Sequence, residues 1–477
     1  MQHLHRTVFE GDNLEVLREI DSTSIDLIYL DPPFNSNAIY AAPIGSKAAG
    51  AAFKDAWTLS DVDLIEHNRL KRESEWLYAL IFAAGKSHSK SMFSYLLMMA
   101  SRLQEMKRIL KDTGSIYLHC DPTASHYLKM IMDGIFGKKK YRNVIVWQRH
   151  TSLAKGSQHL PKSWGTTTDI LLFYANDGAE LRPYRPLTQE EEIKQFPLVD
   201  EHGERYYNDS AHIWSTPNMG ARPNLNYEWR GFVNPHPSGW RLAKERLEEE
   251  YQKGNFVIRE DGKLERRKYK RDFRGKQVGN LWTDISLPLG EERVGYPTQK
   301  PLALLDRIIR ASSKEGDMVL DPFCGCATAM VAAELCGRQW CGIDLSSKAA
   351  ELVVSRIQSQ RDLFSFRDIH HRTDVPIRTD ISRKTASTAS ERFQLKNSLY
   401  DEQEARCNLC LDEFEDRHLE LDHIHPIAKG GKDWIDNFQL LCSNCNRVKR
   451  DRTQDEARAT IAQRKGINLS VFSAQLR

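Results

Sequence analysis

The sequence Ile25-Asp-Leu-Ile-Tyr-Leu-Asp-Pro-Pro-Phe34 joins a short apolar run to an abrupt stop. Residues 25–30 have the length and composition of a buried strand. Proline lacks an N–H group and forces its predecessor into an extended conformation, so the strand ends at Asp31-Pro32-Pro33. A carboxylate, bare carbonyl groups and the Phe34 ring then stand at the carboxyl end of the strand, where open α/β sheets bind ligands. These groups suit a planar amine, and a proline-rich turn after a core strand is the alternative.

Strands and helices are expected to alternate along much of the chain. Strand-like runs lie at 7–9, 25–30, 115–120, 144–147, 170–174 and 340–344, and a further strand-like run begins at Met318. Helix-like runs lie at 13–20, 95–110, 124–136, 301–311 and 328–335. This alternation predicts an α/β fold with a Rossmann-like, doubly wound parallel sheet. Residues 35–90 lack a clear period and are expected to form a long functional loop or insertion.

The bulk composition is that of a soluble protein. With 477 residues, two or three domains are expected. No run approaches the roughly 18 apolar residues of a membrane span, and the N-terminus lacks the apolar core of a signal peptide. We therefore expect no membrane contact and an intracellular location. The net charge of +3 does not by itself call for nucleic acid.

Three stretches differ from the α/β pattern. Residues 180–290 are rich in Trp, Tyr, Asn, Pro and basic residues, and we expect a separate subdomain there. Its basic run at 266–276 is interleaved with aromatic rings, which can bind phosphates and stack on bases, although a solvated charged face is the alternative. Residues 366–398 are polar and predict a linker, and residues 456–477 predict a polar tail.

A second strand end is followed by a glycine turn, Asp321-Pro-Phe-Cys-Gly-Cys-Ala-Thr328, and then by a helix. Asp344 ends the next predicted strand, 19 residues after Gly325. A strand, a glycine turn, a helix and an acid at about this spacing form the layout that binds a nucleoside cofactor. The glycine lets the backbone approach the ligand, and the acid accepts hydrogen bonds from ribose hydroxyls.

Two C-x-x-C pairs near the C-terminus, Cys407/Cys410 and Cys442/Cys445, have the spacing of a tetrahedral zinc site. We place a compact module at 399–455. A module of this size has little core of its own, so structural zinc would stabilise it.

The motifs Asp31-Pro32-Pro33-Phe34, Thr298-Gln299-Lys300-Pro301 and Asp321–Thr328, in this order, resemble the permuted β group of amino-methyltransferases that modify DNA bases. The resemblance covers roughly residues 1–360 and implies a methyltransferase domain at 1–365. It implies S-adenosylmethionine as methyl donor, double-stranded DNA as partner and a target-recognition region at 180–290.

By this resemblance, the first motif is catalytic. The Asp31 carboxylate and the Pro32 carbonyl would accept hydrogen bonds from an exocyclic amine, Pro33 completes the motif, and Phe34 would stack on a base flipped out of the duplex. The residues implied in cofactor binding are Asp12, Thr298, Gln299, Lys300, Asp321, Phe323, Gly325, Thr328 and Asp344. Asp12 would contact the adenine, Asp344 the ribose, and residues 298–300 the methionine end. Ala327 stands where the family often has glycine. The motif favours adenine-N6 over cytosine-N4, and RNA or protein methylation is a further alternative.

The sequence Leu421-Asp-His-Ile-His-Pro426, with Asn437 and Asn446 further on, resembles the zinc-containing HNH endonucleases of the ββα-metal type. In that family His423 would be the general base, and Asp422 and Asn446 would hold Mg²⁺ or a similar divalent metal. Asn437 would orient the His423 loop. Many members have His at the position of Asn446. A zinc module that only binds DNA is the alternative.

Together the two resemblances imply a combined modification and restriction enzyme, or a phage enzyme, in the cytoplasm of a bacterium or an infected cell. One HNH site cuts one strand, so a double-strand break needs two modules or two events. A homodimer is one way to supply them.

Overall fold

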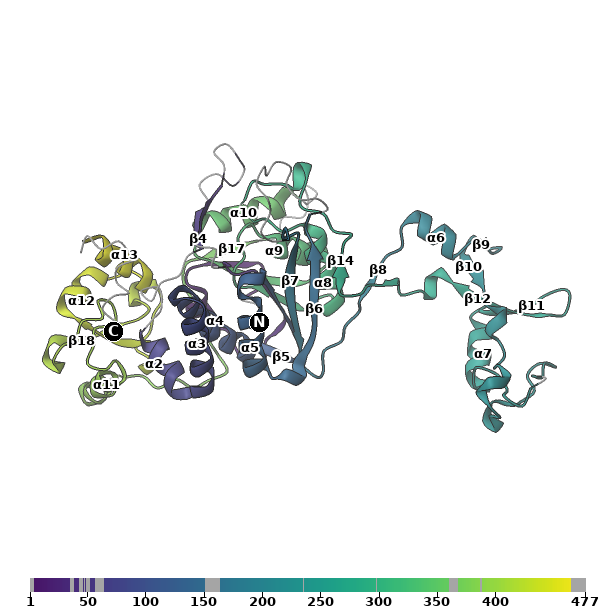
Figure 1. The fold of residues 1–477 in the computed structure, drawn as a ribbon, viewed down its shortest axis with the longest axis horizontal. Coiled ribbons are helices and arrows are strands. Elements are labelled where there is room, and N and C mark those ends of the chain that lie inside the picture. The colour runs from purple at the N-terminus through teal and green to yellow at the C-terminus, as the bar shows by residue number, and fades with distance from the viewer. Residues whose placement is uncertain are drawn as a thin grey trace. The chain divides into compact units, whose positions relative to one another are not determined.

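The computed structural model describes residues 4–34, 38–42, 46, 48, 52–55, 64–150, 164–234, 236–296, 298–359, 368–386 and 388–464. The chain divides into two compact units, one made of Met1–Arg182 and Gly279–Arg477 and the other of Pro183–Val278 (Figure 1). Among the described residues, no helix has the length and apolar character needed to cross a membrane.

A nine-stranded sheet forms the centre of the first unit, in the order β14-β6-β7-β5-β2-β15-β16-β1-β17. The strands are β1 (Thr7–Glu10), β2 (Ile25–Leu30), β5 (Leu110–Cys120), β6 (Tyr141–Gln148), β7 (Thr168–Ala175), β14 (Leu281–Trp282), β15 (Met318–Asp321), β16 (Gln339–Asp344) and β17 (His370–Arg372). β7 runs antiparallel to β5 and β6, and the other neighbours are parallel. The predicted α/β fold is confirmed, and the sheet is parallel, as predicted, except at β7.

Helices pack around this sheet in two groups. The helices are α1 (Asn13–Arg18), α2 (Leu64–Glu73), α3 (Glu75–Ser87), α4 (Lys90–Ile109), α5 (Pro122–Phe136), α8 (Leu302–Ser312), α9 (Thr328–Leu335) and α10 (Ser347–Ser359). α1, α3 and α5 contact α4, while α8 and α10 contact α9 (Figure 1). The β2 side chains of Ile28 and Leu30 face the core that α3, α4 and α5 share. Since strand residues alternate, Leu27 and Tyr29 point to the other face, and all four are buried.

The prediction of a long loop at 35–90 is wrong for the described part of that range. It contains the hairpin β3 (Ala38–Ala41) and β4 (Ala52–Asp55), then α2 and α3, and α4 begins at Lys90. α3 buries Leu77, Ile81 and Ala84, which lie at helical spacing. Trp76 and Phe82 are about half exposed, so apolar residues also occupy the outer face and hide the period.

Described residues of the polar stretch 366–398 make specific contacts within the first unit. β17 pairs with β1 in parallel at the edge of the sheet. The Thr379 backbone N–H and hydroxyl donate to the Asp21 carboxylate, at 2.6 and 2.8 Å, and Arg383 pairs with Glu19 at 2.7 Å. Ion pairs and a short edge strand therefore order a segment that is poor in apolar residues. The domain boundaries themselves stay predictions.

The second unit lies within the range 180–290 that was predicted to differ. Its elements are β8 (Tyr184–Arg185), α6 (Gln189–Gln195), β9 (Leu198–Val199), β10 (Arg205–Asn208), α7 (Lys244–Gln252), β11 (Phe256–Ile258), β12 (Leu264–Tyr269) and β13 (Lys276–Gln277). A four-stranded sheet runs β11-β12-β10-β9. Fully buried Trp240 centres an aromatic cluster with Trp214, Tyr227 and Trp229, which explains the aromatic content of this stretch.

The C-terminal module is built from α11 (Ala389–Glu402), β18 (Leu419–His423), β19 (Phe438–Cys442), α12 (Ser443–Lys449) and α13 (Gln454–Arg464). β18 and β19 form an antiparallel pair that α12 follows, which is the expected ββα order. Its small core includes Leu399, Leu440 and Leu441. The predicted polar tail begins inside α13, and its residues after 464 lie outside the described part of the chain.

Candidate active sites

Four acidic residues from the sequence predictions meet at one edge of the central sheet. β2, β15, β16 and β1 are neighbours and parallel, so their carboxyl ends share that edge. Asp31 follows β2, Asp321 ends β15, Asp344 ends β16 and Asp12 follows β1. The strand order thus brings the Asp-Pro-Pro-Phe motif beside the glycine turn.

The glycine turn is tied to the acid that follows it. Gly325 has a φ of 48°, and its N–H donates to Asp344 Oδ2 at 2.8 Å, while Ser346 N–H donates to Asp344 Oδ1 at 2.9 Å. Burial raises the pKa of Asp344. A carboxylate oxygen has two lone pairs, so each of these oxygens can still accept a ribose hydroxyl. Ala327 has a φ of 69°, a left-handed conformation that explains why glycine suits this position.

Several residues implied in cofactor binding also stabilise the turn and its surroundings. Asp321 is buried and accepts the Phe323 N–H at 3.0 Å, and burial raises the pKa of Asp321 well above its ordinary value. Thr328 donates to the Lys300 carbonyl at 3.2 Å. Asp12 caps α1 by accepting the Leu14 N–H and also accepts a bond from Arg102, both at 2.7 Å. These contacts place the residues together, and their roles toward a cofactor stay predictions.

The segment around Thr298 is held by the side chain of Gln299. Thr298 has a φ of 63°, which is uncommon for a β-branched residue. The Gln299 amide accepts the Val294 N–H at 2.9 Å and donates to the Glu292 carbonyl at 2.7 Å. Gln299 therefore clamps the loop from Glu292 to Lys300, a structural role that the sequence did not suggest.

The Asp31 carboxylate has one satisfied oxygen and one open oxygen. Lys300 Nζ donates to Asp31 Oδ2 at 2.5 Å. Asp31 Oδ1 is buried and has no hydrogen-bond partner among the described residues. A buried acceptor without a partner is costly unless a ligand supplies the donor. This oxygen therefore fits a substrate N–H.

A buried polar chain that the sequence analysis missed lies beneath Phe34. The Phe34 ring stacks on the His119 ring, with centroids 6.0 Å apart and planes at 26°. His119 contacts the Tyr29 hydroxyl through Nδ1 at 3.0 Å and Asp169 through Nε2 at 3.2 Å. Burial alone would raise the pKa of Asp169, but the His119 bond and nearby cations outweigh it and lower that pKa. Polar residues within strongly apolar strands were the available signal.

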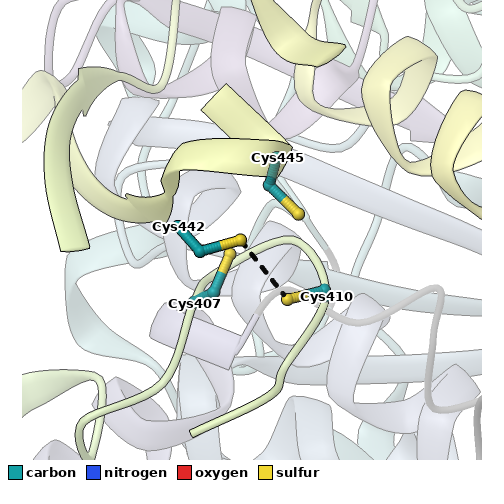
Figure 2. Close-up of side chains that lie close together, drawn as sticks. All are labelled: Cys407, Cys410, Cys442 and Cys445. Atoms are coloured by element: carbon teal, nitrogen blue, oxygen red, sulfur yellow. Dashed lines mark hydrogen bonds between the residues drawn. The ribbon is translucent and has the colours of Figure 1, made fainter. Parts of the chain in front are cut away.

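The four predicted zinc ligands lie together in the C-terminal module. The sulfur atoms of Cys407, Cys410, Cys442 and Cys445 lie within 4.8 Å of one another, and all four residues are buried. Figure 2 shows the sulfurs turned toward one another, with Cys410 and Cys442 Sγ 3.9 Å apart. Tetrahedral zinc with Zn–S bonds of about 2.3 Å separates sulfurs by about 3.8 Å, so the residues fit this metal.

The predicted nuclease residues lie on β18, directly before β19 and on α12. His423 Nε2 lies 2.9 Å from Asp433 Oδ1, a partner that the sequence analysis missed. Asn437 accepts the His425 N–H at 2.8 Å and donates to the His425 carbonyl at 3.0 Å, so it fixes the loop that follows His423. This geometry agrees with an orienting role for Asn437.

The two predicted metal ligands have other partners in this structure. Asp422 Oδ2 accepts bonds from Lys449 at 2.9 Å and from Gln439 at 3.1 Å. The Asn446 amide donates to Glu420 Oε2 at 2.7 Å. Oxygen ligands suit Mg²⁺, and the Asp422 contacts use Oδ2 alone, so Oδ1 can face a metal. The donor set fits a hard divalent cation, and its identity stays a prediction.

Comparison with protein families identifies the larger part of the chain. A family model described as DNA methylase, for N6 and N4 amino groups, matches residues 25–355, and a model described as HNH endonuclease matches residues 407–452. The chain belongs to the DNA methylase family. It also carries a C-terminal HNH endonuclease domain, as the sequence motifs predicted.

Known relatives of this methylase include enzymes of restriction-modification systems. Type II methyltransferase M.EcaI of Enterobacter cloacae is 29% identical over 55% of this chain and 57% of its own length. The StyLTI Mod subunit, a type III restriction-modification enzyme subunit of Salmonella typhimurium, is 27% identical over 68% of this chain and 49% of its own length. The chain thus spans about half the length of these two relatives. DNA adenine methyltransferase YhdJ of Escherichia coli is 24% identical over 74% of this chain and 82% of its own length. A solved Thermus thermophilus structure, a putative DNA modification methylase with S-adenosyl-L-methionine, shares 17% identity over 75% of this chain and 97% of that chain, with a TM-score of 0.35.

The basic run of the methylase's second unit is largely balanced by acidic neighbours. Its ion pairs are Arg266–Asp209 at 3.2 Å, Arg267–Glu265 at 2.9 Å, Lys270–Glu192 at 2.5 Å, Lys276–Glu191 at 2.9 Å, and Arg271 with Glu204. Arg271 also lies 3.8 Å from the centroid of the Tyr269 ring. Internal pairing reduces the field that these cations offer to phosphates, and their contact with DNA stays a prediction.

Proposed function

We propose that this methylase transfers a methyl group from S-adenosylmethionine to the N6 amine of adenine in DNA. The observation that carries the proposal is the open Asp31 Oδ1, buried at the end of β2 on the edge that also holds the Gly325 turn. An acceptor for an amine and a turn suited to a nucleoside cofactor belong to neighbouring strands, β2 and β15. Proximity of this kind is what a group transfer requires.

The chain's own groups would make the amine reactive. An exocyclic base amine is a weak nucleophile because its lone pair is delocalised into the ring. Hydrogen bonds from the amine to Asp31 Oδ1 and to the Pro32 carbonyl favour a pyramidal nitrogen whose lone pair is free to react. Phe34, supported by His119, offers a face on which a flipped base can stack. Bound at Gly325 and Asp344, S-adenosylmethionine would supply an electrophilic methyl group.

Adenine is favoured over cytosine because Asp-Pro-Pro-Phe is typical of adenine-N6 enzymes. One relative, YhdJ, is named a DNA adenine methyltransferase, which supports the same choice. Cytosine-N4 methylation is the nearer alternative, and methylation of RNA or protein is the more distant one.

Single-molecule sequencing of modified bases tests the proposal directly. Genomic DNA is prepared from cells that lack their own adenine methylation and express the full chain. We expect N6-methyladenine at one recurring sequence, its loss with Asp31→Ala, and its retention with Asp177→Ala, a matched removal of an exposed acid. N4-methylcytosine instead would assign the other base. A wild-type pattern identical to that of Asp31→Ala would refute DNA methylation.

We also propose that the HNH domain hydrolyses DNA. The observation in favour is the oriented His423, paired with Asp433, beside a loop that Asn437 fixes. With Nε2 held by a carboxylate, Nδ1 can take a proton from water. Asp422 and Asn446 would hold a divalent cation, which would supply charge stabilisation at the scissile phosphate. A module that binds DNA without cutting it is the rival.

A plasmid nicking assay separates the two. Wild-type protein with Mg²⁺ or Mn²⁺ should convert supercoiled DNA to the open circular form, and His423→Ala should not. His418→Ala, which removes an exposed histidine of the same domain, should cut as wild type does. Methylated and unmethylated plasmids are both tested. If the wild-type protein cuts neither of them, the nuclease proposal fails and the domain is a module that binds DNA without cutting it. Light scattering of the same preparation measures whether the chain forms the predicted homodimer.

A further inference from the structure

Lys300 is buried between the two side chains that would contact the target base. Its side chain is 9% exposed. Its Nζ lies 2.5 Å from Asp31 Oδ2, 3.3 Å from the Thr298 carbonyl and 5.3 Å from the centroid of the Phe34 ring. A buried ammonium requires partners, and here they are the catalytic carboxylate and the stacking ring.

The backbone around Lys300 is fixed on both sides. Upstream, the Gln299 amide clamps the loop by its bonds to Val294 and Glu292. The Lys300 carbonyl accepts the Thr328 hydroxyl at 3.2 Å, which ties it to the start of α9, directly after the glycine turn. The lysine is therefore held against the methyl-donor side of the site and reaches from there to Asp31.

Within the part of the chain that the structure describes, Lys300 is the cation that forms an ion pair with Asp31. Among the described residues, five other titratable groups have pKa values that Asp31 influences: Tyr29, Cys120, Tyr296, Asp321 and Cys326. Burial raises the pKa of each of these five groups, so each is held toward its neutral form. Lys300 therefore supplies a positive charge directly beside the Asp31 carboxylate.

We propose that Lys300 is a positioning residue for the Asp31 carboxylate. Its ammonium holds Oδ2, so that the ionised carboxylate presents Oδ1 as the acceptor for the base amine. This inference rests on the proposed methylation of an exocyclic amine. It assigns the Lys300 ammonium to the carboxylate and not to the methionine end of the cofactor. Without the lysine, the partly buried carboxylate would more readily take up a proton, and the neutral carboxyl would be a weaker acceptor for the amine N–H.

The test is single-turnover methylation by Lys300→Met across a pH series. We expect the rate at pH 7 to fall by about tenfold to a hundredfold, since removing an opposite charge and leaving burial moves a carboxyl titration by one to several pH units. The rate should recover as the pH rises, because the carboxyl then ionises. S-adenosylmethionine affinity, measured by calorimetry, should stay within about twofold of wild type, which also reports that the site is folded.

A double-mutant cycle shows whether Lys300 acts through Asp31. In an Asp31→Asn background, whose amide oxygen is a neutral acceptor, adding Lys300→Met should change the rate by less than about threefold. If Lys300→Met does not fold, Lys300→Gln keeps a donor for Oδ2 without the charge and should show the same shift of the pH profile. Lys300→Arg should keep the wild-type profile.

Three results would overturn the inference. One is a wild-type pH profile in both Lys300→Met and Lys300→Gln. Another is a tenfold loss of S-adenosylmethionine affinity with an unmoved profile, which would assign Lys300 to the cofactor. The third is a faster methylation rate in Lys300→Met, which would mean that the lysine side chain blocks the position of the target base and has to be displaced by it. A wild-type chain that methylates no DNA would refute the proposed function instead, so the two failures are distinct.

Discussion

Gly342→Ala is expected to displace the Gly325 turn, the proposed cofactor-binding turn, by crowding the residues packed against it. Gly342 lies within β16, two residues before Asp344, between β1 and β15. A Cβ atom there would stand 2.7 Å from Met330 Sδ and 3.1 Å from the Cβ and Sγ of Cys324. Cys324 directly precedes Gly325, so any movement that relieves the crowding shifts the turn.

The size of the effect follows from two opposing contributions. An extra methyl in a packed core costs about 1–3 kcal/mol. Met330 and Cys324 are both almost fully buried, so neither can move into solvent. Replacing glycine by alanine in a strand returns about 0.5–1 kcal/mol of backbone entropy. We therefore expect a net loss of stability of about 1–2 kcal/mol, and an S-adenosylmethionine affinity weakened by up to roughly tenfold if the turn absorbs the strain.

Urea unfolding and calorimetric titration of S-adenosylmethionine measure the two effects. Gly11→Ala is the matched control, because it lies at the same sheet edge and its added Cβ would have no atom within 4 Å. The double variant with Met330→Val, which removes the crowding sulfur, should regain part of the affinity lost in Gly342→Ala. The reasoning is refuted if Gly342→Ala unfolds and binds the cofactor as Gly11→Ala does.

Three further predictions concern the rest of the chain. Gly431→Ala would drive a Cβ into the His425 carbonyl oxygen, so plasmid nicking should be lost while DNA methylation continues. Cys410→Ser should lower the bound zinc measured by mass spectrometry from one ion to none and unfold the HNH domain, and unchanged zinc would contradict the four-cysteine site. Hydrogen bonds, first from Arg230, lower the pKa of Glu248 to about 2. Its contribution to the stability of the second unit should therefore be complete above the ordinary carboxyl pKa and disappear as the pH falls from about 4.5 to about 2; tryptophan fluorescence should follow this change, and Glu248→Gln should make the pH dependence shallower, the remainder coming from other paired carboxylates such as Glu191.

Local patterns predicted those parts of the fold that depend on local sequence. The strand ends at Asp31 and Asp344 were evident because in each case an apolar run ends in an acid, and at Asp31 two prolines follow directly. Helix α3 was missed because exposed Trp76 and Phe82 blur its buried stripe. The ordered part of 366–398 was missed because ion pairs such as Arg383–Glu19 leave no period in the sequence.

Contacts between distant residues were the part of the sites that sequence reasoning could not supply. Asp31 and Lys300 were both selected, but as members of different motifs 269 residues apart, and nothing in either motif shows that they touch. His119 and Asp169 were not selected at all, and the pairing of β5 with β7 brings them together. Composition reports which groups are present, whereas the register of a sheet decides which groups meet.

The two sites of this chain share one way of arranging a carboxylate. Asp31 follows strand β2 and Asp422 belongs to strand β18, and in each case a buried lysine from a distant position binds Oδ2. Lys449 has a fully buried side chain and also donates to the His423 carbonyl at 2.5 Å. A lysine that occupies one oxygen fixes the carboxylate and places a positive charge beside it, and the other oxygen remains for an amine in one site and for a metal in the other. Removing either lysine would leave a partly buried carboxylate without its counter-ion, so the two proposed chemistries depend on the same electrostatic condition although their folds are unrelated.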